Sequence, residues 1–279
     1  MSGIITEEKY KPIGVFDSGV GGLTVAREIM RQLPNEELVY FGDTARVPYG
    51  SKSKETITRY SKQIVHFLLE KQVKAIVVAC NTASALALPE IRTHLSVPII
   101  GVVGPGAKVA AEATRNGKIG VIGTEATIGS QIYTRVIHEH NPSAEVIGKA
   151  CPLFVPLVEE GWRKDPITEE IARRYLMSFQ TTGIDTLIMG CTHYPLLRGM
   201  LRRIMGEQVT LVNPAYETAQ ELKELLAANH ILNDGKDQKE GKETPYRFFV
   251  SDAAEKFKEF ANTILPCEIK EARLVHIEE

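Results

Sequence analysis

Cysteine is scarce in this chain of 279 residues, which contains four: Cys80, Cys151, Cys191 and Cys267. So few thiols do not make the disulfide framework of a small secreted protein, and we expect all four to be reduced. The two nearest in sequence, Cys151 and Cys191, are 40 residues apart. This spacing excludes a CxxC redox pair and a clustered zinc site, so any chemistry that the thiols share must be assembled by the fold.

An excess of charge and a long hydrophobic run are also missing. The chain has 33 Lys and Arg against 35 Asp and Glu, without the basic surplus of nucleic-acid-binding proteins. The longest nearly apolar stretch, 97–107, is about half of the ~20 residues that a membrane span needs. Residues 1–11 are charged where a signal peptide needs an apolar run. We therefore expect a cytoplasmic protein that binds neither nucleic acid nor a membrane.

Short runs of Val, Ile and Leu alternate with amphipathic helical segments. Continuous apolar runs are typical of parallel strands that are covered on both faces. Strands are predicted at 13–16, 38–41, 75–79, 98–102, 118–122, 186–189, 209–212 and 246–250. Helices are predicted at 22–33, around the apolar positions from 57 to 68, after Asp165-Pro166, and at 253–264. This alternation predicts an α/β fold, and the apolar-free stretch 233–243 is expected to be a solvated surface loop.

Two segments of the sequence recur in the same order. Residues 13–15 (IGV) return as residues 119–121, 106 positions later. Residues 77–82 (VVACNT) are echoed by residues 188–193 (IMGCTH), 111 positions later. We infer two similar α/β domains with mainly parallel sheets, and an active site in the cleft between them.

Cys80 and Cys191 are the candidate catalytic thiols, because each follows a predicted strand and precedes a helical segment (83–91 and 195–204). Ligands bind at the carboxyl ends of parallel strands. The N-terminus of a helix also lowers the pKa of a thiol, so we expect thiolate character at both positions. Cys151 and Cys267 lie beside prolines and are predicted to be structural.

The loop at 17–24 (DSGVGGLT) resembles a dinucleotide-binding fingerprint but does not match it. The third glycine position holds Thr24, and no Walker lysine follows. Asp17 would repel a phosphate, and suits a ligand ammonium group or the orientation of a base; the glycines can equally serve a tight turn. Residues 48–50 (PYG) form either a plain turn or a loop that offers backbone N–H groups and a phenol to an anion. Glu159 and Glu160 are predicted to lie on a surface face, and His138 and His140 to be solvated.

Taken together, these segments resemble glutamate racemase. The resemblance rests on residues 16–24 (FDSGVGGLT), 43–50, 79–83 (ACNTA) and 190–195 (GCTHYP). The cysteine motifs are shared with aspartate and hydantoin racemases, whereas DSGVGGLT and PYG are more particular to the glutamate enzyme. The resemblance implies a homodimeric isomerase that supplies D-glutamate for peptidoglycan, without cofactor or metal. It also implies one domain of residues 1–103 plus 215–279 and another of residues 104–214.

The chemistry of inversion explains why two thiols are needed. A proton must leave one face of Cα and another must reach the opposite face, so two acid/base groups flank the carbon. The resemblance assigns Cys80 to D-glutamate and Cys191 to L-glutamate, and implies that Asp17 and His193 assist them. By the same resemblance, the substrate is held by Asp17, Ser18, Tyr49, Gly50, Asn81, Thr82, Thr124, Thr192 and His193.

Other functions fit parts of this pattern. An aspartate racemase would share the thiols, and would differ in the reach of the substrate toward Ser18 and Tyr49. A non-catalytic amino-acid-binding protein with a hinged cleft would bind the ligand without exchanging its Cα proton. A thiol redox protein is disfavoured, because no cysteine has a resolving partner close in sequence.

Overall fold

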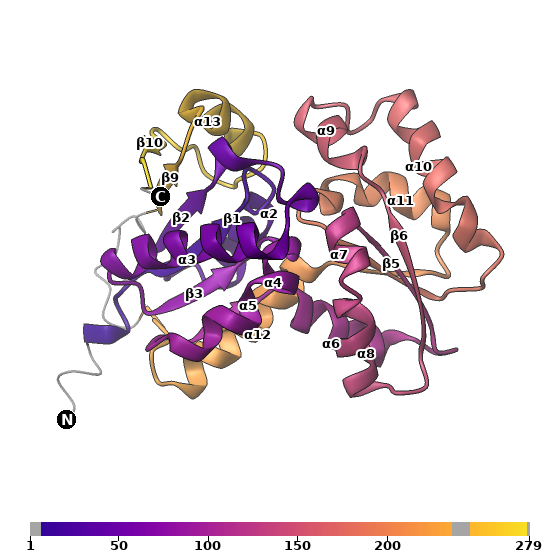
Figure 1. Ribbon diagram of the computed structural model, residues 1–279, viewed down its shortest axis with the longest axis horizontal. Coiled ribbons are helices and arrows are strands. Elements are labelled where there is room, and N and C mark those ends of the chain that lie inside the picture. The colour runs from indigo at the N-terminus through magenta and orange to yellow at the C-terminus, as the bar shows by residue number, and fades with distance from the viewer. Residues whose placement is uncertain (1–6, 236–245, 278–279) are drawn as a thin grey trace.

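The computed structural model describes residues 7–235 and 246–277, and its strands form two parallel sheets. Figure 1 shows the two sheets in separate lobes that lie side by side, each with helices packed around it. This architecture confirms the predicted α/β class with two similar domains. We call the lobe that holds the N-terminal strand the first domain and the other lobe the second domain.

The first domain is built on a six-stranded sheet in the order β10-β9-β2-β1-β3-β4. Its strands are β1 (Ile13–Asp17), β2 (Leu38–Gly42), β3 (Ala75–Val78), β4 (Ile99–Gly101), β9 (Tyr246–Val250) and β10 (Arg273–Leu274). The first four strands are buried along their whole length, as their continuous apolar runs predict. The chain leaves this domain after β4 and returns to add β9 and β10 at one edge (Figure 1).

The second domain is built on a four-stranded sheet in the order β6-β5-β7-β8. Its strands are β5 (Lys118–Gly123), β6 (Glu145–Ala150), β7 (Thr186–Gly190) and β8 (Thr210–Val212). This order repeats the order β2-β1-β3-β4 of the first sheet. The recurring IGV segments lie on the equivalent strands β1 and β5, and the cysteine segments on β3 and β7. The sequence echo therefore corresponds to a structural repeat.

The helices cover both sheets. They are α2 (Leu23–Gln32), α3 (Lys54–Glu70), α4 (Asn81–Leu86), α5 (Leu88–Ile91), α6 (Val103–Ala113), α7 (Glu125–Gly129), α8 (Ile132–His140), α9 (Phe154–Glu159), α10 (Pro166–Gln180), α11 (Arg198–Met205), α12 (Pro214–Ala228) and α13 (Ala254–Asn262). Short 3₁₀ turns span Thr44–Arg46, Tyr49–Ser51, Arg92–His94 and Tyr194–Leu197. Asp165 caps α10 by accepting the Ile167 N–H at 2.7 Å, and Pro166 occupies its first turn, which confirms this predicted helix start.

Three local features differ from the predictions. Strands β6 and β10 were not predicted, because both lie at sheet edges and neither has a fully buried residue. The helical segment predicted at 195–204 is present, but it begins as a 3₁₀ turn at Tyr194–Leu197 and becomes α-helical at Arg198. Asn233, expected in a solvated loop, is buried and donates its backbone N–H to Glu36 and its side-chain amide to the Asn35 carbonyl. Residues 236–243 of that predicted loop lie outside the described residues.

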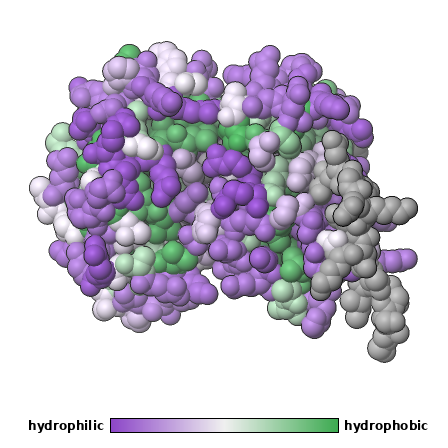
Figure 2. Space-filling model, turned by 180° about the vertical axis from the view of Figure 1, so that it is seen from behind, coloured by the Kyte–Doolittle hydropathy of each residue, from purple (hydrophilic) through white to green (hydrophobic). Residues whose placement is uncertain are grey.

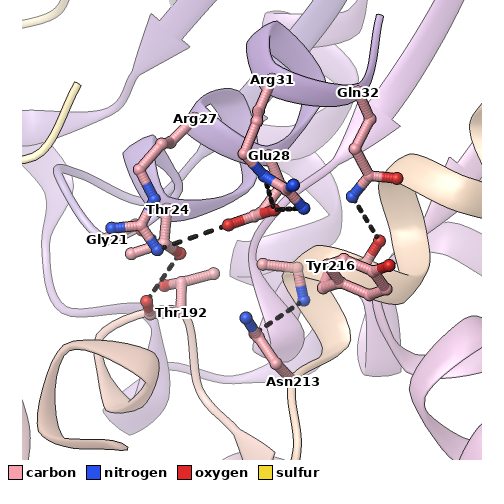
Figure 3. Close-up of polar contacts among 10 residues, drawn as sticks. Gly21, Thr24, Arg27, Glu28, Arg31, Gln32, Thr192, Asn213 and Tyr216 are labelled. Atoms are coloured by element: carbon pink, nitrogen blue, oxygen red, sulfur yellow. Dashed lines mark hydrogen bonds and ion pairs between the residues drawn. The ribbon is translucent and has the colours of Figure 1, made fainter. Parts of the chain in front are cut away.

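The chain crosses between the domains twice, before α6 and before α12, and these helices pack against each other. Their contact is close: a Cβ atom on Gly106 would come within 2.9 Å of the Pro214 ring. Helix α12 also contacts α2, where the Gln32 side chain donates to the Tyr216 carbonyl (Figure 3). The two domains are thus joined by packed helices as well as by the chain itself.

The rear face of the molecule is mainly hydrophilic (Figure 2). Figure 2 shows hydrophobic residues on the rear face in patches between polar ones. None of the described helices has the length and apolar character needed to cross a membrane.

Candidate active site

A cavity of about 360 Å³ lies between the two domains, where the carboxyl ends of both sheets meet. The first domain contributes to its wall Ser18, Tyr49, Gly50, Cys80, Asn81 and Thr82. The second domain contributes Thr124, Cys191, Thr192 and His193. Every site residue proposed from the sequence lines this cavity except Asp17, which lies buried at the end of β1.

The repeat explains why these residues meet. Ser18 follows β1 and Cys80 follows β3, while Thr124 and Cys191 follow the equivalent strands β5 and β7. Because all of these strands are parallel, their carboxyl ends lie at one edge of each sheet. The two edges face each other, so residues more than 100 positions apart in sequence share one cavity.

The first thiol, Cys80, is buried beside a negative charge. Its Sγ lies 3.7 Å from the Ser18 hydroxyl. Burial raises its pKa to about 12, and the charge of Asp17 acts in the same direction, although hydrogen bonds from the Ala83 N–H and Ser18 oppose the change. The expected lowering by a helix N-terminus is therefore wrong for Cys80. Helix α4 is only 6 residues long, and desolvation outweighs what its amide groups supply.

The second thiol, Cys191, is buried beside a group that carries positive charge. The His193 Nδ1 lies 3.8 Å from the Cys191 Sγ, and its Nε2 lies 2.9 Å from Glu159 Oε1. Burial alone would lower the pKa of His193, but hydrogen bonds to Cys191 and Glu159, together with their charges, raise it to about 10. The imidazole is therefore protonated at neutral pH, and it places positive charge next to the Cys191 sulfur.

Glu159 was not predicted as a site residue. It lies at the end of α9, lines the cavity and has a side chain that is 33% exposed. Two adjacent acids are typical of a solvated surface. Glu160 is indeed exposed, whereas Glu159 is partly buried against His193. The only sequence signal for its role was the apolar run before it, which places it at the end of a packed helix.

Asp17 lies behind the cavity wall and is completely buried. Its Oδ2 accepts the Gly19 N–H at 3.0 Å, whereas its Oδ1 has no hydrogen-bond partner among the described residues. Burial raises its pKa, while the charge of His193 and the backbone N–H groups of the glycine turn lower it. The turn itself requires glycine, because a Cβ on Gly22 would come within 2.4 Å of the Asp17 Cβ.

Hydrogen bonds join the two domains across the cleft. The Thr82 hydroxyl lies 3.1 Å from that of Thr124 and 3.3 Å from that of Thr127. The Tyr133 hydroxyl donates to Asn81 Oδ1 at 2.7 Å. Thr127 and Tyr133 were not predicted to take part, because neither lies in a motif. They fix the residues next to Cys80 from the opposite domain.

Helix α2 of the first domain likewise contacts the loop that follows Cys191 in the second domain. The buried Thr24 hydroxyl lies 2.8 Å from the Thr192 carbonyl, to which it donates (Figure 3). Gly21 approaches the same loop so closely that an added Cβ would lie 2.3 Å from the Thr192 hydroxyl and 2.5 Å from the His193 ring. The first domain thus packs directly against the residues that follow Cys191.

The loop after β2 forms another part of the wall. The Tyr49 hydroxyl donates to Asp43, so the phenol is already hydrogen-bonded within the protein. Gly50 faces Thr124 across the cleft, and a Cβ there would lie 3.0 Å from the Thr124 Cβ. This loop lines the cavity from residue 47 to residue 51, with the Tyr49 phenol already engaged by Asp43.

The polar groups of the wall are mostly neutral. Among the described residues that line the cavity there is no lysine or arginine. The wall offers hydroxyl, amide and backbone groups instead for hydrogen bonds to a ligand. Within residues 7–235 and 246–277, no group of three or more His, Cys, Asp or Glu is arranged to hold a metal ion.

Comparisons with known proteins agree on one family. The Asp/Glu/hydantoin racemase profile matches residues 13–222. The glutamate racemase of Geobacter metallireducens is 48% identical over 269 residues, which are 96% of this chain and 98% of that protein. The crystal structure of the Bacillus anthracis glutamate racemase RacE1 has a TM-score of 0.89 at 40% identity, covering 97% of this chain and 98% of that one. The Francisella tularensis enzyme, solved in complex with D-glutamate, has a TM-score of 0.88 at 39% identity, covering 97% and 99%.

Proposed function

The chain belongs to the Asp/Glu/hydantoin racemase family, whose members are isomerases, and we propose that it interconverts L- and D-glutamate with two thiols and no cofactor. One observation carries this proposal: Cys80 and Cys191 follow equivalent strands of the two domains and line the same cavity. Two acid/base groups that approach a carbon from opposite sides are what inversion at Cα requires.

The surroundings of the thiols indicate how the proton moves. From L-glutamate, the Cys191 thiolate takes the Cα proton while the neighbouring His193 imidazolium stabilises its charge. The protonated Cys80 then delivers its proton to the opposite face, which yields D-glutamate and a Cys80 thiolate. From D-glutamate the same steps run in reverse. Cys80 begins as a thiol at neutral pH, because burial and Asp17 raise its pKa.

The remaining site residues bind and orient the substrate. Ser18, Asn81, Thr82, Thr124, Thr192 and the backbone at Tyr49 and Gly50 supply neutral groups for the two carboxylates. Asp17, whose Oδ1 has no hydrogen-bond partner among the described residues, supplies negative charge for the ammonium group and acts on Cys80 through the same charge. We further propose that the enzyme works as a cytoplasmic homodimer and that its D-glutamate enters peptidoglycan.

The first test follows the isotope of the transferred proton. With L-glutamate in D₂O and no added cofactor, the D-glutamate formed should carry deuterium at Cα, because the Cys80 thiol exchanges with solvent before it donates. Chiral chromatography with mass spectrometry measures both products. Unlabelled D-glutamate would contradict the two-thiol mechanism. Bound glutamate without exchange would indicate a binding protein, and faster exchange of aspartate an aspartate racemase.

The second test removes each thiol. Cys80→Ala and Cys191→Ala should each lower kcat by ~10²–10⁴-fold or more, because each thiol acts as base in one direction and as acid in the other. Cys267→Ala is the matched control, since this half-buried thiol lies outside the cavity wall. Near-normal turnover by a folded Cys80 or Cys191 variant would rule out the mechanism.

A further inference from the structure

The C-terminal part of the chain contacts the loop at residues 43–50, which carries Tyr49 and Gly50. The family profile ends at residue 222, whereas β9 begins at Tyr246. Strand β9 pairs with β2 in parallel, so the two strands end side by side. Residues 251 and 252, which follow β9, therefore lie against residues 43–45, which begin the loop to Tyr49 and Gly50.

Hydrogen bonds fasten these two segments together. Ser251 Oγ donates to Asp43 Oδ1 at 2.9 Å and accepts the Ala45 N–H at 2.9 Å. The Asp252 N–H donates to the Thr44 hydroxyl at 2.9 Å, and the Thr44 hydroxyl is also bonded to the Asp252 carbonyl. Side chains and backbone of both segments take part, so their relative position is closely fixed.

Asp43 connects the C-terminal segment to the cavity wall, because it is hydrogen-bonded to both Ser251 and Tyr49. The side chain is completely buried, and it accepts hydrogen bonds from Ser251, from the Tyr49 hydroxyl and from Arg46 Nε. Arg46 is held in turn by the Tyr60 ring, whose centroid lies 4.0 Å from the guanidinium carbon. Ser251 is thus one contact away from Tyr49, which lines the cavity.

We propose that Ser251 and Thr44 are positioning residues that fix the Tyr49–Gly50 wall of the substrate cavity from the C-terminal segment. This inference rests on the proposed function. Without the Ser251 hydroxyl, Asp43 loses one of three side-chain donors and the Ala45 N–H loses its acceptor. The loop can then move away from Thr124, against which Gly50 fits closely.

The kinetic signature of this role differs from that of a catalytic group. We assign the Tyr49–Gly50 wall to the side-chain carboxylate of the substrate, because this wall holds neither of the two thiols. Contacts with that carboxylate bind the ground state and the transition state alike. Loss of such uniform binding raises KM and leaves kcat unchanged. A residue that only stabilises the fold would lower the melting temperature without changing KM.

The test compares Ser251→Ala with two reference variants. Ser251→Ala should raise KM about tenfold for both L- and D-glutamate while kcat stays within about twofold of the wild type. Ser251→Thr keeps the hydroxyl and should restore KM. Ser143→Ala is the matched control, because Ser143 is an exposed serine that also donates at 2.9 Å, to Asn141. Unchanged KM in Ser251→Ala, or a fall in kcat alone, would overturn the proposal.

A second variant and a second measurement decide the proposal even if Ser251→Ala does not fold or the protein does not racemise glutamate. Thr44→Val removes the contacts with Asp252 and should raise KM in the same way; if Ser251→Ala fails to fold, unchanged KM in Thr44→Val overturns the proposal. Calorimetric binding of D-glutamate should weaken about tenfold in Ser251→Ala. If the wild type binds glutamate but does not racemise it, the proposed function fails while this binding comparison still decides the role of Ser251.

Discussion

Asp17 and His193 give the two thiols opposite electrostatic surroundings. Asp17 places negative charge near Cys80 and raises its pKa together with burial, whereas His193 places positive charge 3.8 Å from the Cys191 sulfur. The geometry therefore suits Cys191 as the base that meets L-glutamate, with Cys80 as the acid. For D-glutamate the roles are reversed, with Cys80 as the base and Cys191 as the acid.

Substitution of Glu159 tests the difference between the surroundings of the two thiols, because Glu159 helps to raise the pKa of His193. The folded protein raises that pKa to about 10, so His193 stays charged below this pH and loses its charge as the pH rises through it. Glu159→Gln removes one of the causes, and the alkaline decline of kcat/KM for L-glutamate should move to lower pH. Rate profiles from about pH 7 to about pH 11 measure the shift.

Glu160→Gln is the control for this prediction, because Glu160 is the adjacent exposed acid and has no place in the cavity wall. Its profile should match the wild type. An identical alkaline limb in all three proteins would show that Glu159 does not set the charge of His193. The sequence could not reveal this role, because the contact depends on bringing residue 159 to residue 193 through the tertiary fold.

At the scale of elements, buried strands were predictable and edge strands were not. Strands β1, β2, β3 and β7 have no exposed residue, and their composition alone marks them. Strand β6 has Glu145, Gly148 and Lys149 among its six residues and no buried position, so its hydrogen bonding to β5 decides its structure. The ends of the buried strands carry the thiols, which is why the motifs of the site could be found before the fold was known.

The turn before α2 gives a prediction at this scale. Gly21→Ala would place a methyl group 2.3 Å from the Thr192 hydroxyl, so α2 or the Cys191 loop must shift. We expect a loss of about 1–3 kcal/mol in the free energy of unfolding. We also expect kcat/KM to fall by about tenfold or more, because small displacements of catalytic groups are costly. Chemical denaturation and kinetics measure the two effects.

Gly104→Ala is the matched glycine substitution. Gly104 lies in the first turn of α6, and an added Cβ meets no atom within 4 Å other than those of its two chain neighbours. Alanine is the better helix former, but a Cβ before Pro105 disfavours helical backbone, so the free energy of unfolding should change by less than about 1 kcal/mol and the activity should be kept. Equal effects of the two substitutions would mean that the approach of Gly21 to the Thr192 loop has no importance.

At the scale of the whole molecule, the first domain consists of two stretches of chain that must be held together. We propose limits at residues 103 and 215, close to the starts of α6 and α12. A buried ion pair of the first stretch is hydrogen-bonded to the second: Lys74 Nζ lies 2.5 Å from Glu36 Oε2 and donates to the Ile231 carbonyl, and Glu36 accepts the Asn233 N–H. Both side chains are almost completely buried.

Lys74→Met should destabilise the protein by about 3–5 kcal/mol, because it leaves the Glu36 charge buried without its partner. Lys62→Met is the control, since the Lys62–Glu90 pair is about half exposed and worth at most about 1 kcal/mol. Urea unfolding curves of both variants measure the difference. Similar small losses would show that the buried pair does not hold the two stretches together.

The lack of lysine and arginine among the described residues of the cavity wall has a consequence for how the substrate arrives. Glutamate carries two negative charges and one positive charge, and no lysine or arginine among the described lining residues attracts it from a distance. Glu125 and Glu159 lie in the wall and oppose its approach. The charge of His193 is offset by its partner Glu159, so the wall offers no net attraction, and recognition begins only at contact with the hydroxyl and backbone groups. Because salt screens a repulsion here rather than an attraction, kcat/KM for glutamate should not fall, and should rise modestly, as the ionic strength is raised.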